Sequence, residues 1–314
     1  MQGTGRRGVL GALGGALATA GCATTPSESS TGTTPHAAVG SKQFTANRLL
    51  GWMTFETLLA RGSVDPVNRM GTGGTDETWR ALVDGDVHCY WEYTGTAWRD
   101  ILGRDERFGD ADALYDAVVD ALADRDVAVA ARGGYDNAYV LYARRAWVDR
   151  TGIETLDELF SWLADGNDDV RVAITEHFKQ RQDGWSALLD HYDLDPDGRE
   201  RLAARTTFVE PLVTYDLLAS GAADVGLGYA TNPNVVALDV VALEDDHRFF
   251  PPYQPILLVD ETAASAAAVL ETTDSLGRAL DDAAVLRELT ARVAFDDESP
   301  RTVAREHLRE VGVL

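Results

Sequence analysis

The chain has 314 residues, of which 51 are Asp or Glu and 28 are Lys or Arg, and its formal net charge is -23. Such a negative field repels phosphate, so nucleic acid is excluded as a natural partner. Lys42 and Lys179 are the only lysines in the sequence, and arginine supplies every other basic side chain. An acidic, lysine-poor surface stays soluble in concentrated salt, where screening removes self-repulsion, so we infer a halophilic source.

The first 22 residues are typical of an export signal. Arg6 and Arg7 precede an apolar run that reaches Ala20 without an acidic residue, and Cys22 follows shortly after it. This pattern indicates a lipoprotein signal that is cleaved before its cysteine, and the arginine pair also fits a twin-arginine signal. We expect residues 1–22 to form this signal and Cys22 to carry a lipid at the extracellular face of the cytoplasmic membrane.

From residue 37 onward, short apolar runs alternate with amphipathic helical segments, which predicts an α/β fold with mostly parallel strands. Helices are expected around residues 49–59 and 79–83, and several more without a clear strand over 263–314. The expected strands cover residues 38–41, 87–91, 127–131, 138–143, 170–174, 223–228 and 240–243.

The domain organisation follows from composition and length. Residues 23–36 are rich in Thr, Ser, Gly and Pro and predict a disordered linker. The remaining chain is longer than the usual domain of about 100 to 150 residues, which indicates two lobes. Because Gly133 and Gly134 end one α/β unit and a Phe-Phe-Pro-Pro segment interrupts a later one, we expect lobe 1 to comprise 37–133 plus 249–314 and lobe 2 to comprise 134–248.

Motifs for metals and nucleotides are incomplete. Asp193 opens an EF-hand-like run, but the position of the bidentate Glu is taken by Ala204. The glycine-rich loop 71–75 lacks the lysine of a P-loop, and the six histidines have no metal-site spacing. Cys89 is expected to be a core residue. We expect no metal or cofactor, and no catalytic nucleophile or acid/base pair that would make the protein an enzyme.

The sequence VHCYWEYTGTAW over residues 87–98 is the densest aromatic stretch of the chain. Aromatic side chains at two-residue spacing on a strand usually pack in a core, so Tyr90, Trp91 and Trp98 are interpreted in this way. Tyr93 differs because it lies where the strand ends and a Thr-Gly-Thr turn leads into a helix. Open α/β sheets bind ligands at this kind of junction, so we expect Tyr93 to line a small-molecule pocket.

Two basic residues lie at similar junctions. Lys42 follows the first expected strand at the head of a helix, and Arg181 lies between a strand that ends at Ile174 and a helix that begins at Trp185. An ammonium or guanidinium group beside a helix amino terminus makes a good carboxylate site. A surface lysine without a specific role is an equally good interpretation of Lys42 from composition alone.

Several segments together resemble the glycine betaine and choline binding proteins of osmoprotectant ABC transporters. These are GSKQFTANRLL, GTGGTDETWRALVDGDVHCYWEYTGTAW, YDNAYVLYARR, EHFKQRQDGW, GLGYATNPNV and EDDHRFFPPY, and they occur in the family's order from about Ala38 to the end of the chain. The resemblance implies a two-lobed, type II periplasmic-binding-protein-like α/β fold, with mixed sheets flanked by helices and a ligand cleft between the lobes.

The resemblance also assigns site residues. The family surrounds a quaternary ammonium group with aromatic rings, which are here Tyr93, Tyr139, Tyr229 and Tyr253. Lys42, Thr96 and Arg181 would clamp the ligand's carboxylate. Asn137 stands two residues before Tyr139, one of these four tyrosines. The family would have an aspartate at the position of Asn137, and Asp136 is adjacent.

The implied function is an extracellular solute-binding lipoprotein that captures glycine betaine or a related quaternary ammonium osmoprotectant. Its expected partners are an ABC permease and ATPase, and we expect the protein to be a monomer. Retention of Lys42 and Arg181 favours a ligand with a carboxylate. Choline or carnitine binding, and a ligand-sensing domain without a transport role, remain as alternatives.

Overall fold

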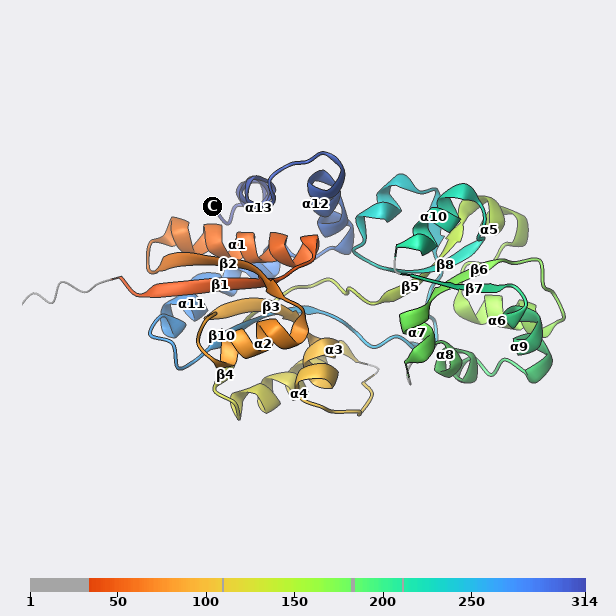
Figure 1. The fold of residues 1–314 in the computed structure, drawn as a ribbon, viewed down its shortest axis with the longest axis horizontal. Helices are drawn as coiled ribbons and strands as arrows, with labels where there is room; N and C mark the ends of the chain where they lie inside the picture. Colours follow the sequence, from red (N-terminus) through yellow and green to blue (C-terminus); the bar gives the residue numbers. More distant parts are fainter. Residues whose placement is uncertain (1–33, 109, 182–183, 211) are drawn as a thin grey trace, which may run out of the picture. The chain divides into compact units, whose positions relative to one another are not determined.

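The computed structural model describes residues 34–314 apart from 109, 182–183 and 211 (Figure 1). The expected signal, its Cys22 and most of the linker therefore lie outside the described residues. The first strand begins at His36, the last residue assigned to the linker. Among the described helices, none combines the length and apolar character that crossing a membrane requires.

The first of two five-stranded sheets, called sheet A, has the strand order β2-β1-β3-β10-β4. β1 runs parallel to β2 and β3, whereas β10 is antiparallel to β3 and β4. A strand from near the end of the chain thus inserts between two early ones. The strands are β1 (His36–Lys42), β2 (Asp65–Gly73), β3 (Cys89–Tyr93), β4 (Val127–Arg132) and β10 (Pro255–Asp260).

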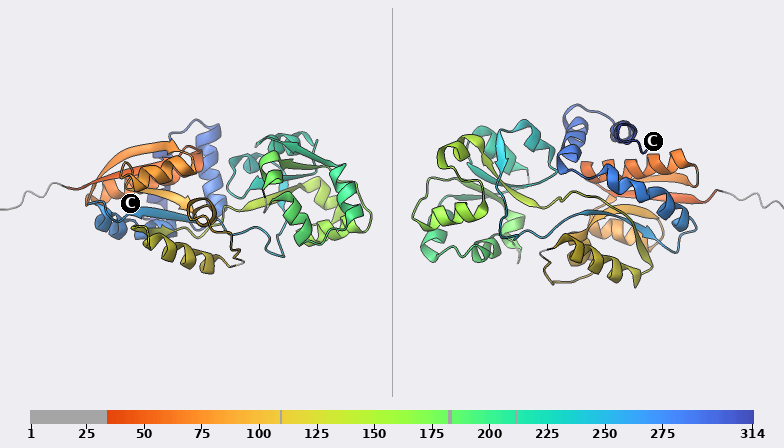
Figure 2. Two further views of the ribbon diagram at one scale, coloured as in Figure 1. Left: turned by 60° about the horizontal axis from the view of Figure 1, so that its bottom comes forward. Right: turned by 180° about the vertical axis from the view of Figure 1, so that it is seen from behind.

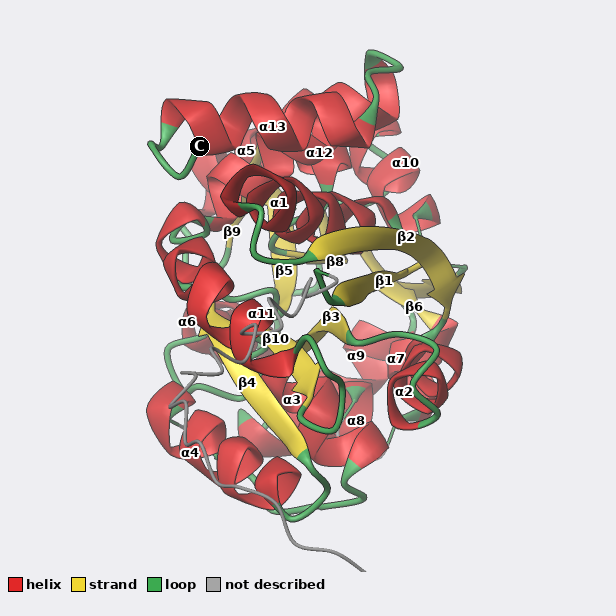
Figure 3. Cartoon of the chain, turned by 90° about the vertical axis from the view of Figure 1, so that its left-hand side faces the viewer, coloured by secondary structure: helices red, strands yellow, loops and turns green. Residues whose placement is uncertain are grey.

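Both faces of sheet A are buried because its central strands carry apolar side chains on both sides. In β10, Leu257 and Val259 pack in one core, and Ile256 and Leu258 pack in the other. The first core is closed by α1 (Thr45–Arg61), α11 (Ala266–Thr273), α12 (Ala283–Phe295) and α13 (Pro300–Glu310). The second is closed by α2 (Thr75–Val83), η1 (Ala97–Ile101) and α4 (Ala111–Ala123), and Figure 3 shows α4 beside β4.

The second sheet, sheet B, has the order β7-β6-β8-β5-β9. β6 is parallel to β7 and β8, and β5 is antiparallel to β8 and β9. The strands are β5 (Tyr139–Arg144), β6 (Val172–Thr175), β7 (Thr206–Val209), β8 (Val225–Tyr229) and β9 (Val240–Ala242). Its helices are α5 (Arg145–Thr151), α6 (Leu156–Ala164), α7 (Glu176–Gln180), α8 (Trp185–His191), α9 (Pro196–Ala203) and α10 (Val213–Ser220).

Two chain segments connect the sheets, and both can be followed in Figure 2. Residues 133–138 lead from β4 to β5, and residues 243–254 lead from β9 back to β10. The short elements α3 (Thr94–Thr96), η2 (Pro233–Ala237) and η3 (Asp274–Ala279) complete the fold. Arg287 of α12 also reaches across, and its Nη1 donates a hydrogen bond of 3.0 Å to the carbonyl of Ala230.

All seven expected strands are present to within two residues at each end, and the helical segment after residue 263 is confirmed. Two expectations were wrong. Three strands were missed, β2, β7 and β10. The sheets are mixed, as the resemblance implied, and not mostly parallel, as the strand pattern alone predicted, because half of the strand pairs in the described residues are antiparallel. The antiparallel pairs arise where β5 and β10 enter a sheet directly after a connection between sheets.

Candidate functional site

A cavity of about 580 Å³ lies at the ends of strands from both sheets, and all eight predicted ligand-binding residues line it. They come from six separate parts of the chain, and the fold brings every one of them to the same space. The predicted residues are Lys42, Tyr93, Thr96, Asn137, Tyr139, Arg181, Tyr229 and Tyr253. Cys22 lies outside the described residues.

Tyr139 and Tyr229 form one wall as a cross-strand pair. They are directly opposite in the antiparallel register of β5 and β8, their ring centroids are 4.7 Å apart, and the Tyr229 hydroxyl donates to the Tyr139 hydroxyl at 3.1 Å. Phe178 supports the Tyr139 ring from behind at 4.9 Å. Tyr139 is therefore held by packing, whereas Tyr229 keeps 38% of its surface exposed.

Tyr93 forms part of the opposite wall, at the end of β3 and opposite Pro255 of β10. Its ring stacks on Phe44, with centroids 6.4 Å apart and 22° between the planes. Phe44 is 45% exposed and lines the same cavity, although it was not among the predicted site residues. Tyr90, Trp91 and Trp98 are buried, as expected for core residues.

Tyr253 is positioned by its backbone and by Gly95. Its N–H donates to Asp136 Oδ1 at 2.7 Å, and its carbonyl accepts the N–H of Asn137 at 3.0 Å, so the two connecting segments are tied together here. The Tyr253 ring lies so close to Gly95 that a Cβ there would be 2.7 Å from its Cε1 atom. Gly95, the glycine of the EYTGT segment, therefore leaves the space that the Tyr253 ring occupies.

The Asn137 side chain forms a hydrogen bond with the loop that follows β8 of sheet B. Its Oδ1 accepts a 2.5 Å hydrogen bond from the hydroxyl of Thr231, which also lines the cavity. Thr96 is the last residue of α3, and Arg181 follows α7. Asp100 is the one acidic side chain among the described residues that line the cavity.

Lys42 is not an isolated cation. Its Nζ lies 2.5 Å from Oε1 of Glu92 and donates to Thr75 Oγ1 at 2.9 Å. Burial raises the pKa of the Glu92 carboxyl, while Lys42 and the N–H of Tyr93 act in the opposite direction and favour the carboxylate. Glu92 was not among the predicted site residues, and its carboxylate neutralises the Lys42 charge that the proposed carboxylate clamp uses.

The hydroxyls of Tyr93 and Tyr229 stay protonated. Desolvation by burial raises the pKa of Tyr93 and of Tyr229 above the usual range, and for Tyr229 the adjacent Tyr139 adds to the shift. A cation would thus meet neutral rings, whose π faces carry partial negative charge, rather than phenolates.

Other residues of the cavity wall were not predicted. Leu212, next to an undescribed residue, has a backbone φ of 76°, a left-handed conformation that is uncommon for a branched side chain. Thr290 in α12 has a buried hydroxyl for which the described residues supply no hydrogen-bond partner. The unpredicted members of the wall are Phe44, Thr45, Ala46, Asp100, Leu212, Thr231, Asn232, Pro233, Asn234, Thr290, Ala294 and Phe295.

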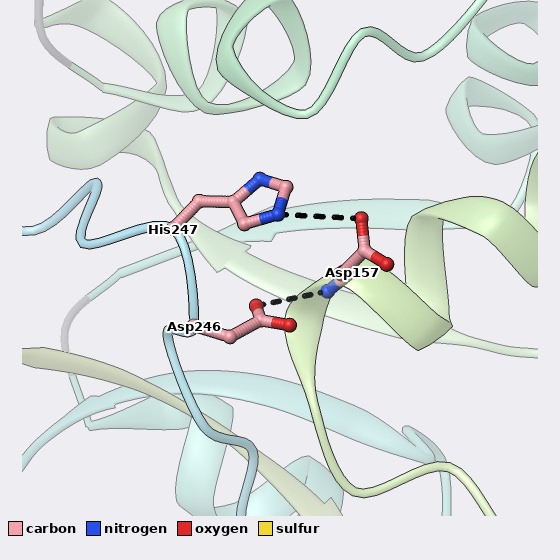
Figure 4. A group of neighbouring side chains, drawn as sticks. All are labelled: Asp157, Asp246 and His247. Atoms are coloured by element: carbon pink, nitrogen blue, oxygen red, sulfur yellow. Dashed lines mark hydrogen bonds and ion pairs between the residues drawn. The ribbon is translucent and has the colours of Figure 1, made fainter.

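One group of possible metal ligands occurs in the described part of the chain, away from the residues that line the cavity. Asp157, Asp246 and His247 are exposed, and their ligand atoms lie within 4.8 Å of one another (Figure 4). Each already has a structural contact: Asp246 accepts the N–H of Asp157 at 3.2 Å, and the His247 ring stacks on Tyr192. The hydrogen bond from Asp157 satisfies an N–H group in the first turn of α6, so this cluster has a structural role at the start of that helix.

Comparison with known proteins agrees with this geometry. Residues 37–310 match the family described as the substrate binding domain of the ABC-type glycine betaine transport system. The chain is 30% identical over 281 residues to the chemotactic signal transduction system substrate-binding protein CosB of Halobacterium salinarum, covering 86% of this chain and 82% of the relative. A glycine-betaine-binding protein of Pseudomonas aeruginosa is 27% identical over 285 residues, covering 88% of each chain.

Solved structures share the fold. Apo YehZ of Escherichia coli superposes with a TM-score of 0.75 at 22% identity, over 90% of this chain and 100% of that one. A glycine betaine/carnitine/choline ABC transporter protein gives 0.76 at 20% identity, over 88% and 99%. These matches confirm the expected periplasmic-binding-protein-like α/β fold, and the family contains binding proteins for transport rather than enzymes. The chain belongs to the family of substrate-binding domains of ABC-type glycine betaine transport systems.

Proposed function

We propose that this protein binds glycine betaine or a closely related quaternary ammonium osmolyte and delivers it to an ABC permease. The observation that carries the proposal is one cavity with four tyrosines and two basic side chains in its wall. A methylated ammonium has no N–H to donate, so ring faces suit it better than hydrogen-bond acceptors do. One of the two relatives above is named a glycine-betaine-binding protein, which supports this ligand class.

The ammonium end would lie among the four rings. Tyr139 and Tyr229 supply one wall and Tyr93 and Tyr253 the other. Each ring contributes about 0.5 to 2 kcal/mol of cation-π attraction in such sites, so four rings support micromolar binding once the other end of the ligand is held. In concentrated salt these desolvated contacts persist, whereas exposed ion pairs weaken.

The carboxylate end would lie near Lys42, Thr96 and Arg181. The first two come from sheet A and its following turn, and Arg181 follows β6 of sheet B through α7. Asn137 would act indirectly, because its side chain holds Thr231 at the rim. Ligand groups at these positions would contact both sheets at once.

Ligand binding would then favour closure. We propose lobe 1 as residues 37–133 plus 249–314 and lobe 2 as 134–248, with hinges in the two segments that connect the sheets. Closure on the ligand would be the state that the permease recognises. We further propose that residues 1–22 act as a lipoprotein export signal and that Cys22 anchors the protein to the membrane. Release of a Cys22→Ser variant from membranes into the medium would support this anchor.

The test of the ligand class is calorimetry in molar salt with glycine betaine, proline betaine, carnitine and choline. We expect glycine betaine to bind with a micromolar dissociation constant and the carboxylate-free choline to bind more weakly. Failure of all four to bind below millimolar concentration would contradict the proposal.

A second candidate function is ligand presentation to a chemotaxis transducer. It is favoured by the relative from Halobacterium salinarum, whose name places it in a chemotactic signal transduction system. A sensor role needs no transducer segment in this chain, because a separate membrane protein would read the closed form. Uptake of labelled betaine and chemotaxis toward betaine, both measured in a deletion strain, separate the two: loss of uptake indicates transport, and loss of chemotaxis alone indicates sensing.

A further inference from the structure

The Lys42–Glu92 pair lies in the protein interior at the edge of the cavity. The parallel register that pairs Val39 with Cys89 brings Lys42 alongside Glu92 on neighbouring strands. The Lys42 side chain is 6% exposed and lines the cavity, whereas the Glu92 side chain is fully buried behind it. A ligand at the cavity wall would therefore meet the ammonium first and the carboxylate second.

Glu92 is fixed by more than the ion pair. Its Oε1 accepts the N–H of Tyr93 at 2.8 Å as well as the Lys42 ammonium, and its Oε2 accepts the Tyr90 hydroxyl at 3.3 Å. Lys42 uses a second of its three N–H donors on Thr75. Both charges are thus held in place by β1, β3 and the start of α2, and the carboxylate cannot turn away to solvent without breaking several contacts.

We infer that Glu92 determines which end group the cavity accepts: by neutralising Lys42, it reduces the preference for a ligand carboxylate and admits quaternary ammonium compounds whose other end is an uncharged hydroxyl. This inference rests on the proposed function. It adds Glu92 as a specificity-determining residue that does not itself line the cavity.

The physical reason is that the Lys42 ammonium, when paired with the Glu92 carboxylate, acts on a ligand as a dipole. The electric field of a dipole is weaker than that of a single charge. A ligand carboxylate near the Lys42 ammonium is attracted by that charge and repelled by the Glu92 carboxylate directly behind it. The binding of a ligand hydroxyl is weakened little by the Glu92 charge, because a hydroxyl needs a hydrogen-bond donor rather than a net charge. Removing the Glu92 charge should therefore strengthen the binding of a carboxylate far more than that of a hydroxyl.

The test compares glycine betaine with choline, which share the trimethylammonium group and differ at the other end. Glu92→Gln keeps the side-chain shape and an oxygen that can accept from Lys42. We expect the ratio of the choline to the betaine dissociation constant to rise at least about tenfold in this variant, measured by calorimetry at pH 7. A folded Glu92→Gln protein with an unchanged ratio overturns the inference.

Glu56→Gln is the matched control. Glu56 is also a buried carboxylate, in α1, where it pairs with Arg301 and Arg305 of α13, but it does not line the cavity. This variant removes the same charge from the same part of the protein, and we expect it to leave the ratio within about twofold of the wild type. A tenfold change in Glu56→Gln would show that net charge, and not the position of Glu92, sets the ratio, and would overturn the inference.

Glu92→Asp covers the case in which Glu92→Gln does not fold. It keeps the negative charge but withdraws the carboxylate by one methylene from the Lys42 ammonium and from the cavity, so we expect the ratio to rise in the same direction by a smaller factor, about two- to threefold. An unchanged or lower ratio in a folded Glu92→Asp protein contradicts the inference. If the wild type binds neither ligand, the proposed ligand class is wrong, whereas binding of both with an unchanged ratio in Glu92→Gln removes only the role of Glu92.

Discussion

Gly95 shows how a single residue positions the aromatic wall. The ring of Tyr253 occupies the space where any Cβ at this position would lie, with contacts of 2.7 to 3.0 Å. Gly95→Ala should displace the ring and weaken betaine binding about tenfold while the fold is retained. Gly74→Ala is the control, since a Cβ there meets only the flexible Glu77 carboxylate at 3.1 Å. Equal affinities of the two variants in calorimetry would contradict this account of Tyr253.

Tyr229 allows the contribution of a ring to be separated from that of its hydroxyl. The hydroxyl donates to Tyr139, and the ring face is open to the cavity. Tyr229→Leu should weaken betaine binding at least about tenfold because it removes one π face, whereas Tyr229→Phe should change it by less than about threefold. Similar losses in both variants would mean that hydrogen bonding, rather than the ring, holds the ligand.

Site residues could be predicted where a short sequence motif identifies them, and not where only the folded structure brings them to the site. Tyr93, Tyr139, Tyr229 and Tyr253 each stand in a short motif at the end of a strand, and such positions meet at one edge of the fold. Glu92 could not be recognised as the partner of Lys42, because their contact depends on the register of β1 with β3, 50 residues apart. Exposed apolar members of the wall, such as Phe44 and Phe295, carry no motif and are brought there only by folding.

The pairing of β6 with β8 is reinforced by a side-chain clamp at its start. The backbone N–H and the guanidinium of Arg171 donate three hydrogen bonds of 2.8 to 3.0 Å to the Asp224 carboxylate. Burial alone would raise the pKa of Asp224, but the hydrogen bonds from Arg171 hold it below its usual value. The stabilisation is therefore complete above the unfolded-state pKa and is lost as the pH falls through the lower folded-state pKa.

Asp224→Asn should consequently unfold more easily at pH 7, by about 1 to 2 kcal/mol, since Arg171 is half exposed and solvent weakens the pair. The loss should shrink as the pH falls toward the folded-state pKa of Asp224. Urea unfolding in molar salt at several pH values measures both effects. Asp239→Asn, which removes an exposed partner of Arg145, serves as the control. A wild-type-like stability of Asp224→Asn at pH 7 would contradict the role of the clamp.

Two of the strands that escaped prediction, β2 and β10, lack the alternating burial pattern of a typical strand for different reasons. β2 reads DPVNRMGTG and pairs only with β1, so as an exposed edge strand it lacks the apolar alternation of a buried one. β10 is fully buried, but it follows directly on the Pro-rich connection and its neighbours in the sheet are distant in sequence. Periodicity identifies strands with a regular burial pattern, whereas strand order and direction depend on contacts between distant segments.

The charge of the whole chain predicts a strong dependence of stability on salt. If residues 1–22 are removed as we propose, Arg6 and Arg7 are lost and the remaining chain has 26 basic and 51 acidic residues, a net charge of -25. Self-repulsion at this charge acts over about 10 Å in 0.1 M salt and about 3 Å in 1 M salt. The unfolding temperature, measured by calorimetry, should therefore rise steeply between these concentrations. An unfolding temperature that is constant or falls would contradict a halophilic adaptation.

The central claim is that the aromatic cavity holds a quaternary ammonium ligand between the two sheets. The most direct test is a crystal structure of the protein with glycine betaine. We predict the trimethylammonium group among Tyr93, Tyr139, Tyr229 and Tyr253, with the carboxylate facing Arg181. A ligand bound outside this cavity, or one whose ammonium group contacts none of the four rings, would contradict the account.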